Sequence, residues 1–448
     1  MPDVEGSPIA SVIEQMEFLI GQSLVKRMRS DEMAPKDNLE SRFHLLETIR
    51  EYALEQLARA GEQADVQRQH ASYYLSLVEK TEASLSGDDS AAAVALFVRE
   101  QGNLRAALAW ATDHGENDTA LRISCALGRF WEARMQFHEA FRWIDAVFKL
   151  QADTPLSARA NLLMGAARLA LWEIGCERSR ELAQEALTLY AAEGNQVGRT
   201  WALFHIGDTW HIQGDYVLSS TYLEQCLQLL HAQQDWRNYA FTLSRLGALA
   251  TLRGQMQKAR AWLSEARELL YEYDEPGLQT VTLVYLGILT FVQGELVLSS
   301  NYLREGMLLA RQTGNHYMLA ADLLVLGCAL GRMYGPFYTA HICSAAEMLY
   351  ASLKASVPTA YRPLYDTNLG SLQAKVDRVT WDMWWEEGKA FSLEEICTLA
   401  LSAERSQRSR STDALPRALI ARRGQVAATS AAGTGHCNIM VLSFVPCA

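Results

Sequence analysis

The residues that could do chemistry in this 448-residue chain do not occur in the patterns that catalysis requires. The chain lacks the G-x-S-x-G, H-E-x-x-H and G-x-G-x-x-G motifs, which position a nucleophile, a zinc ion and a dinucleotide. Neighbouring carboxylates such as Glu386 and Glu387 would point about 100° apart on a helix, so they do not make an acid–base pair. We therefore predict that the chain is not an enzyme and uses no cofactor.

Cysteine and histidine spacing argues against a metal site. The 8 cysteines are scattered singly, without a C-x-x-C pair, which is typical of a reducing compartment. His205 and His211 are too far apart around a helix to share an ion. Cys226 stands at a small-residue position of a repeated unit, where a core thiol is expected.

Composition and charge set further limits. The formal net charge of −11 argues against a general nucleic-acid-binding surface. Residues 1–10 are polar and acidic, unlike a signal peptide, and we find no apolar run of about 18 residues. These features predict a cytoplasmic protein without a membrane partner.

A repeat of 40 residues organises the middle of the chain and must position any binding residues. Two glycine series keep this step: Gly207, Gly247, Gly287 and Gly327, and then Gly214, Gly254 and Gly294. Apolar residues three and four positions from these glycines predict two amphipathic helices per unit. We expect the first series inside helices, where a partner helix approaches closely, and the second series at left-handed helix ends. Such a period is typical of a solenoid.

The repeated pattern of a small residue, an aromatic residue, a turn glycine and a second small residue is clearest at Gly207, Trp210, Gly214 and Cys226, and the last copy is degraded, with Tyr334 at the turn. This order is the one found in tetratricopeptide repeats, which residues 121–354 resemble. The step of 40 residues is long for that family and is similar to the sensor region of LuxR-type bacterial transcriptional regulators, including MalT-like and AfsR-like members. The resemblance implies an all-α fold, a right-handed superhelix of helix pairs.

The run RFHLLETIREYALEQL (Arg42–Leu57) resembles the end of the winged-helix module of STAND-type signalling ATPases. The residues before position 62 predict a helix over 13–22, strands over 23–29 and 42–47 around a polar turn, and a helix over 48–60. The resemblance implies a partial winged-helix module (1–62) and an irregular helical connector (63–120). No G-x-x-x-x-G-K-[ST] loop is present, so we expect no ATP hydrolysis and a fragment of a longer regulator.

After the repeats we predict C-terminal capping helices (355–402) and a disordered basic tail (403–448). Proline should break the chain at Pro358 and Pro363, before short helices over 372–379, 381–387 and 391–401. The tryptophans at 381, 384 and 385 could stack on a base or ligand, but we favour an aromatic cap on the solenoid end. The tail is either a basic nucleic-acid arm or a truncated end without function.

By analogy with tetratricopeptide repeats, the inner helix of each unit should line a concave face. The candidates for this binding face are Trp201, Phe204, Asp208, His211, Phe241, Ser244, Val284, Ile288 and Phe291. The face is mostly apolar with one polar corner, which suits a small apolar or aromatic effector or an amphipathic protein segment. Alternatively, these side chains pack between neighbouring repeats.

The sequence favours a non-enzymatic solenoid that is the sensor or partner-binding part of a bacterial signal-transduction transcriptional regulator. A free-standing protein–protein interaction scaffold is the second hypothesis. The third is a DNA-binding regulator that uses its N-terminal winged-helix remnant, where Lys26 and Arg27 would contact phosphate or simply protect an edge strand.

Overall fold

The computed structural model describes residues 8–28, 42–82, 84, 90–150, 155–353 and 355–403. Contacts between residues divide the chain into two compact units. The first consists of Met1–Leu77 with Glu100–Ala120, and the second of Val78–Arg99 with Leu121–Ala448. The predicted turn between the two strands and almost all of the predicted tail lie outside the described residues.

The first unit contains a helix and a two-stranded hairpin, followed by further helices. Its elements are α1 (Pro8–Gly21), β1 (Val25–Met28), β2 (Arg42–Leu45), α2 (Glu47–Ala60) and parts of α3 (Gln63–Glu82) and α4 (Ser90–Asp113). The strands are antiparallel, with Val25 opposite Leu45. The helix α2 ends at Gly61, whose φ of 75° is the left-handed conformation that glycine adopts without strain. The strands and helices predicted for residues 13–60 are confirmed at these positions.

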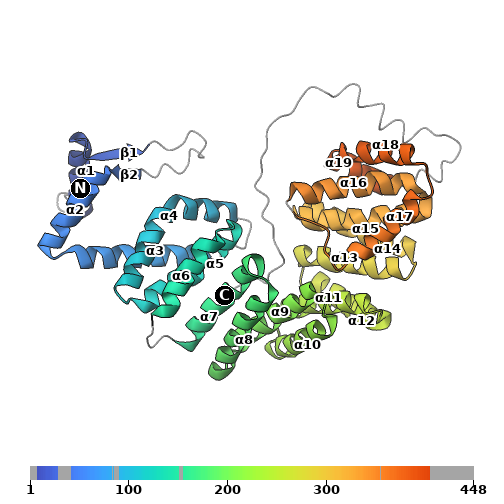
Figure 1. Ribbon diagram of the computed structural model, residues 1–448, viewed down its shortest axis with the longest axis horizontal. Helices are drawn as coiled ribbons and strands as arrows, with labels where there is room; N and C mark the ends of the chain where they lie inside the picture. The colour runs from blue at the N-terminus through green and yellow to red at the C-terminus, as the bar shows by residue number, and fades with distance from the viewer. Residues whose placement is uncertain are drawn as a thin grey trace, which may run out of the picture. The chain divides into compact units, whose positions relative to one another are not determined.

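The second unit is a stack of antiparallel helix pairs (Figure 1). Its helices are α5 (Asn117–Ala133), α6 (Phe137–Lys149), α7 (Leu156–Glu173), α8 (Cys176–Glu193), α9 (Gln196–Gln213), α10 (Tyr216–Gln233), α11 (Trp236–Leu252), α12 (Met256–Glu272), α13 (Pro276–Val292), α14 (Leu296–Gln312), α15 (His316–Tyr334), α16 (Pro336–Ser352), α17 (Arg362–Gln373), α18 (Arg378–Lys389) and α19 (Leu393–Ser402). The predicted all-α helical-repeat fold is therefore confirmed.

The mid-helix glycines bring the two helices of a unit together. A methyl group added at Gly287 in α13 would lie 2.4 Å from Cδ2 of Leu303 in α14, and one at Gly247 would lie 2.5 Å from Cγ of Leu263 in α12. The leucine side chains thus fill the space that a Cβ would need. The predicted role of these glycines in close helix packing is confirmed.

The turns between helices contain residues with a left-handed backbone conformation at a fixed interval. The turn glycines Gly214, Gly254 and Gly294 have φ values of 87°, 73° and 80°, as predicted. The return turns form another series with a step of 40 residues: Gly194, Gln234, Asp274 and Gly314, with φ values of 72°, 57°, 50° and 69°. The sequence did not reveal this series because two of its members are not glycine.

The helix α15 lies in the core of the stack. By length and composition it is apolar enough to cross a membrane, with a mean hydropathy of 1.3, so the expectation that no such run exists was wrong. In this structure 67% of its apolar window is buried among other helices, which explains its composition without a membrane.

The helices after the last repeat fold back onto it. The helix α17 begins at Arg362, with Pro363 in its first turn. Proline is tolerated there because the N–H groups of the first turn have no partner within the helix. The predicted helix over 372–379 was therefore placed too late in the chain. The ring of Trp381 is buried and stacks on Trp385 at 5.9 Å, while Trp384 contacts Phe337 of α16.

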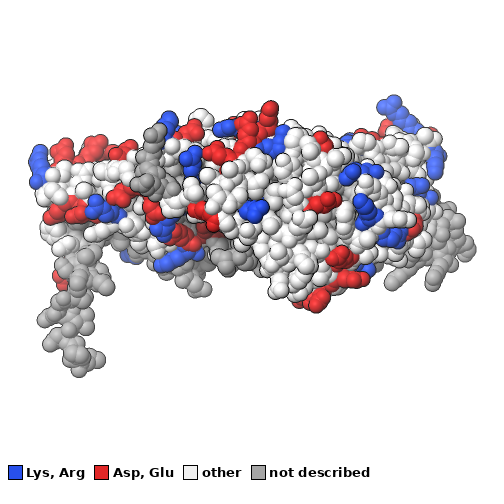
Figure 2. All heavy atoms as spheres, turned by 90° about the horizontal axis from the view of Figure 1, so that it is seen from below, with Lys and Arg blue, Asp and Glu red and all other residues white. Residues whose placement is uncertain are grey.

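Acidic and basic side chains are interspersed on the face of the molecule seen in Figure 2. Among the described residues, ion pairs join successive repeats, for example Arg260 with Glu295 at 2.8 Å. Such exposed pairs add little stability individually, about 0–1 kcal/mol each.

Candidate functional site

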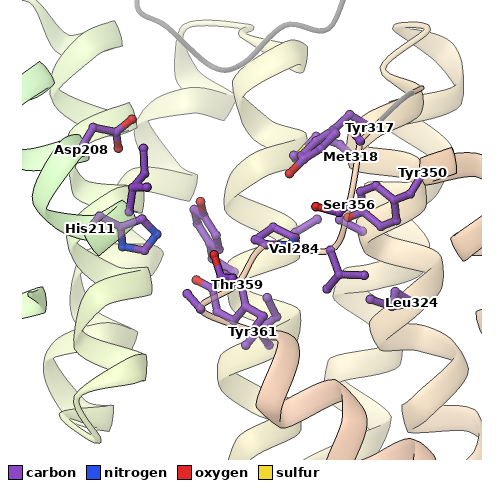
Figure 3. Close-up of a pocket in the computed structure, with 18 of the residues that line it drawn as sticks. Asp208, His211, Val284, Tyr317, Met318, Leu324, Tyr350, Ser356, Thr359 and Tyr361 are labelled. Atoms are coloured by element: carbon purple, nitrogen blue, oxygen red, sulfur yellow. The ribbon is translucent and has the colours of Figure 1, made fainter. Parts of the chain in front are cut away.

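A cavity of about 840 Å³ opens on the inner face of the repeat stack (Figure 3). Its walls are the inner helices α9, α11, α13 and α15, together with a segment that follows the last repeat. The lining residues are Met135, Trp172, Asp208, His211, Ile212, Gln213, Gly214, Tyr216, Arg245, Val284, Tyr285, Ile288, Tyr317, Met318, Ala321, Leu324, Val325, Tyr350 and Ala355–Tyr361. The volume is in the range of small-molecule binding sites.

One wall of the cavity carries a buried polar chain that crosses three repeats. Arg245 of α11 forms an ion pair with Asp208 of α9, and its Nη1 donates a hydrogen bond of 3.0 Å to Oη of Tyr285 in α13. Burial disfavours the charge on Arg245, but Asp208 and Tyr285 outweigh this effect, so the pKa of Arg245 is raised. The guanidinium and the carboxylate therefore neutralise each other inside the cavity wall.

Two polar side chains lining the cavity have atoms without a hydrogen-bond partner among the described residues. They are Nδ1 of His211 and Oη of Tyr350. Burial, assisted by the Arg245 charge, lowers the pKa of His211 to about 4, so its ring is neutral at pH 7. Burial also raises the pKa of Tyr350 well above its ordinary value, so its hydroxyl keeps its proton.

The segment Ala355–Tyr361, which we name the strap, lies across the inner face and closes one side of the cavity. Its Val357 is buried, and the ring of Tyr361 lies 6.4 Å from that of Tyr285. Figure 3 shows Thr359 and Tyr361 of the strap facing the same space as Val284 and His211. The strap was not predicted from the sequence, although the helix was expected to break at Pro358 and Pro363.

The structure divides the nine residues predicted for the concave face into three groups. Asp208, His211, Val284 and Ile288 line the cavity. Phe291 lines a smaller cavity of about 30 Å³, which Leu364 and Tyr365 of α17 cover. Ile288 lines this smaller cavity as well as the main one.

The other four predicted residues do not line the main cavity. The rings of Phe204 and Phe241 stack at 5.6 Å between α9 and α11, and both side chains are buried. The hydroxyl of Ser244 is 2.7 Å from that of Thr282 in α13. These three side chains pack between repeats, and Trp201 is half-buried on α9.

The cavity combines a few polar groups with a largely apolar lining. Its polar groups are tyrosine hydroxyls, the Gln213 amide, the hydroxyls of Ser356 and Thr359, a neutral imidazole and one internally paired ion pair, and the rest of its lining is aliphatic or aromatic. Within the described ranges, no group of three or more His, Cys, Asp or Glu side chains could hold a metal ion. Fold and cavity together define a helical-repeat protein with a cavity on its inner face.

No family model matches the chain. Proteins of Mycobacterium tuberculosis and Mycobacterium bovis, both named provisionally as HTH-type transcriptional regulators, are each 31% identical to it over 205 residues. The alignment covers 44% of this chain and 22% of each relative. The chain therefore spans about a fifth of the length of these relatives.

Among solved structures, the chain is similar to a Rap protein complexed with Competence and Sporulation Factor, with a TM-score of 0.50 and 13% identity. That similarity covers 75% of this chain and 99% of the Rap protein. The apo form of RapI gives a TM-score of 0.49 at 15% identity, over 64% of this chain and 98% of that chain. At such low identity the first similarity supports the helical-repeat fold alone.

Proposed function

We propose that this chain is the sensor part of a bacterial transcriptional regulator, a non-enzymatic solenoid that binds its effector in the inner-face cavity. The names of the mycobacterial relatives support the link to transcriptional regulation. The resemblance of the repeats to the sensor region of LuxR-type and STAND regulators supports the sensor role.

The observation that carries this proposal is the construction of the cavity from four successive inner helices and the strap. A ligand in it would touch α9, α11, α13 and α15 at once, so its binding energy would favour one arrangement of the repeats over others. The strap connects the cavity directly to α17 and the C-terminal helices. Binding would thus be communicated towards the C-terminal end of the chain.

The domain organisation is part of the proposal. A partial winged-helix module (1–62) and a helical connector (63–120) precede the repeats (121–354), which capping helices (355–402) and a basic tail (403–448) follow. We propose a cytoplasmic location, and we expect this chain alone not to contact nucleic acid specifically.

A protein segment is the second candidate for the effector. Met135, Trp172 and Ile212 line one end of the cavity and leave 70%, 46% and 50% of their surfaces exposed. An amphipathic segment could continue from the cavity over these side chains. This arrangement would also serve a free-standing interaction scaffold.

The test compares thermal stability of the full chain with and without candidate effectors, small molecules and short amphipathic peptides, in two matched variants. Ala321 lines the cavity on α15, so Ala321→Phe should obstruct it. Ala192 is exposed on α8, so Ala192→Phe is the control. An effector that raises the melting temperature of the wild type and of Ala192→Phe, but not of Ala321→Phe, supports the proposal. Effectors that stabilise both variants equally would place binding elsewhere.

A further inference from the structure

The cavity has no charge to offer a ligand. Its lining contains one carboxylate, Asp208, and one guanidinium, Arg245, and these are bound to each other. Their side chains are only 18% and 15% exposed, so water screens them weakly. The imidazole of His211, the remaining titratable nitrogen in the lining, is neutral at pH 7.

The cavity does offer hydrogen bonds. The orphan atoms Nδ1 of His211 and Oη of Tyr350 lie on α9 and α16, and Figure 3 shows them on opposite sides of the cavity with Val284 between them. A buried polar atom without a partner is unfavourable, and a ligand group that bonds to it recovers that cost. Between these two positions the walls are mainly aliphatic and aromatic, and they also carry the hydroxyls of Ser356 and Thr359.

We infer that the cavity binds an uncharged small molecule with an apolar or aromatic body and at least one hydrogen-bonding group that reaches His211 or Tyr350. This inference rests on the proposed function and names the chemical class of its effector. A charged ligand would lose its hydration without gaining a counter-ion, because the one cation and the one anion of the wall already satisfy each other. A ligand with no polar group would leave both orphan atoms unpaired.

The test uses four probes built on one scaffold, trans-stilbene. They are stilbene itself, the neutral 4-(hydroxymethyl)stilbene, the anion stilbene-4-carboxylate and the cation 4-(aminomethyl)stilbene. Their affinities for the full chain are measured by displacement of the neutral fluorescent reporter N-phenyl-1-naphthylamine. We expect the hydroxymethyl probe to bind most tightly, the two charged probes to be at least tenfold weaker, and stilbene itself to be about fivefold weaker.

Hydrophobicity alone could produce part of this order, so the decisive measurement changes the charge of the wall. Asp208→Asn leaves Arg245 without its partner, and should strengthen the carboxylate probe about tenfold while the hydroxymethyl probe changes less than twofold. Arg245→Met should instead strengthen binding of the aminomethyl probe. This variant provides the test of the charge argument if Asp208→Asn does not fold. In the double variant His211→Phe/Tyr350→Phe, the advantage of the hydroxymethyl probe over stilbene should disappear.

The outcomes separate this inference from the proposed function. If Ala321→Phe abolishes reporter binding but the charged probes bind as tightly as the neutral one, the cavity is the site and the inferred ligand class is wrong. Charge-insensitive binding in both Asp208→Asn and Arg245→Met also overturns the inference. If the reporter does not bind, or binds Ala321→Phe and Ala192→Phe equally, the proposed site fails and the inference fails with it.

Discussion

Replacing Asp322 by threonine should stabilise the protein. Asp322 lies on α15, fully buried, and neither carboxyl oxygen has a hydrogen-bond partner among the described residues. At steps of 40 residues, the equivalent positions of the two preceding inner helices hold Thr242 and Thr282. The hydroxyl of Thr242 donates a hydrogen bond of 2.9 Å to the carbonyl of Asn238 in its own helix, so a threonine at 322 can be satisfied in the same way.

The magnitude follows from the cost of the unpaired group. Leaving a buried polar group unsatisfied costs about 1–3 kcal/mol, and more if it is charged, so Asp322→Thr should gain at least about 1 kcal/mol. A methyl group added at Gly306 would lie 2.7 Å from Oδ1 of Asp322, whereas the preceding unit has Ala266 at the position of Gly306. The double variant Asp322→Thr/Gly306→Ala restores the residue pair of the earlier unit, and should gain up to about 1 kcal/mol more from helix propensity.

The gain should depend on pH with a defined sign. Burial raises the pKa of Asp322 well above the ordinary 3.8, so the unfolded chain releases this proton at a lower pH than the folded chain does. The wild type therefore loses stability as the pH rises from about 4 towards the raised folded-state pKa, with a slope of at most about 1.4 kcal/mol per pH unit. The threonine variant lacks this loss, so its advantage should be larger at pH 8 than at pH 5.

Urea unfolding followed by far-ultraviolet circular dichroism at both pH values measures the effect. The reciprocal variant Thr282→Asp places a carboxyl at the equivalent buried position and should lower the unfolding midpoint, more at pH 8 than at pH 5. A threonine variant less stable than the wild type, or an advantage that does not change with pH, would refute the reasoning. Either result would mean that Asp322 has a partner in solution.

Three further expectations concern packing, protonation and the strap. Gly287→Ala should destabilise the protein by up to about 2 kcal/mol, because overpacking costs about 1–3 kcal/mol and the gain in helix propensity returns only about 1 kcal/mol. Gly165→Ala is the control and should stabilise the protein, because its added methyl group meets nothing within 4 Å. Equal shifts of the two melting temperatures would contradict the packing argument. Burial lowers the pKa of His205 to about 4, so the unfolded chain binds a proton there first and stability should fall as the pH drops from about 6.5 to 4. In melting experiments over this range, His205→Gln should lose less stability than the wild type. An unchanged pH profile would show that this histidine titrates normally. Val357→Asp should detach the strap, because the attached strap would bury an unpaired charge. Limited proteolysis should then show new cleavage within residues 355–361. An unaltered digestion pattern would show that the strap is held by other contacts.

The repeat architecture could be predicted from the sequence because its signal is periodic. Glycines at a constant step identify both the close helix contacts and the turns, and each additional copy strengthens the inference. The turn positions Gln234 and Asp274 escaped notice since their left-handed conformation is imposed by the units around them rather than by residue type.

The candidate site was only partly predictable, because the inner helices pack against neighbours on both sides. Phe204 and Ser244 face adjacent repeats, which leaves a narrow strip of each helix for the cavity. Arg245 lies within that strip, yet it follows the predicted Ser244 by one residue, a rotation of about 100° around the helix. The strap has no periodicity at all, and its position depends on contacts with helices far away in the sequence.

The return turns at Gln234 and Asp274 make the chain divisible into interchangeable segments. Each turn has a left-handed residue followed by a backbone hydrogen bond to the carbonyl of the preceding helix, Asp235 to Leu230 at 3.1 Å and Glu275 to Leu270 at 3.0 Å. Excision of residues 235–274 would join Gln234 to Glu275 in a turn of the same conformation and remove α11 and α12 as one piece. The shortened protein would keep the strap but lose Arg245, so the number of segments sets both the length of the cavity and the chemistry of its wall.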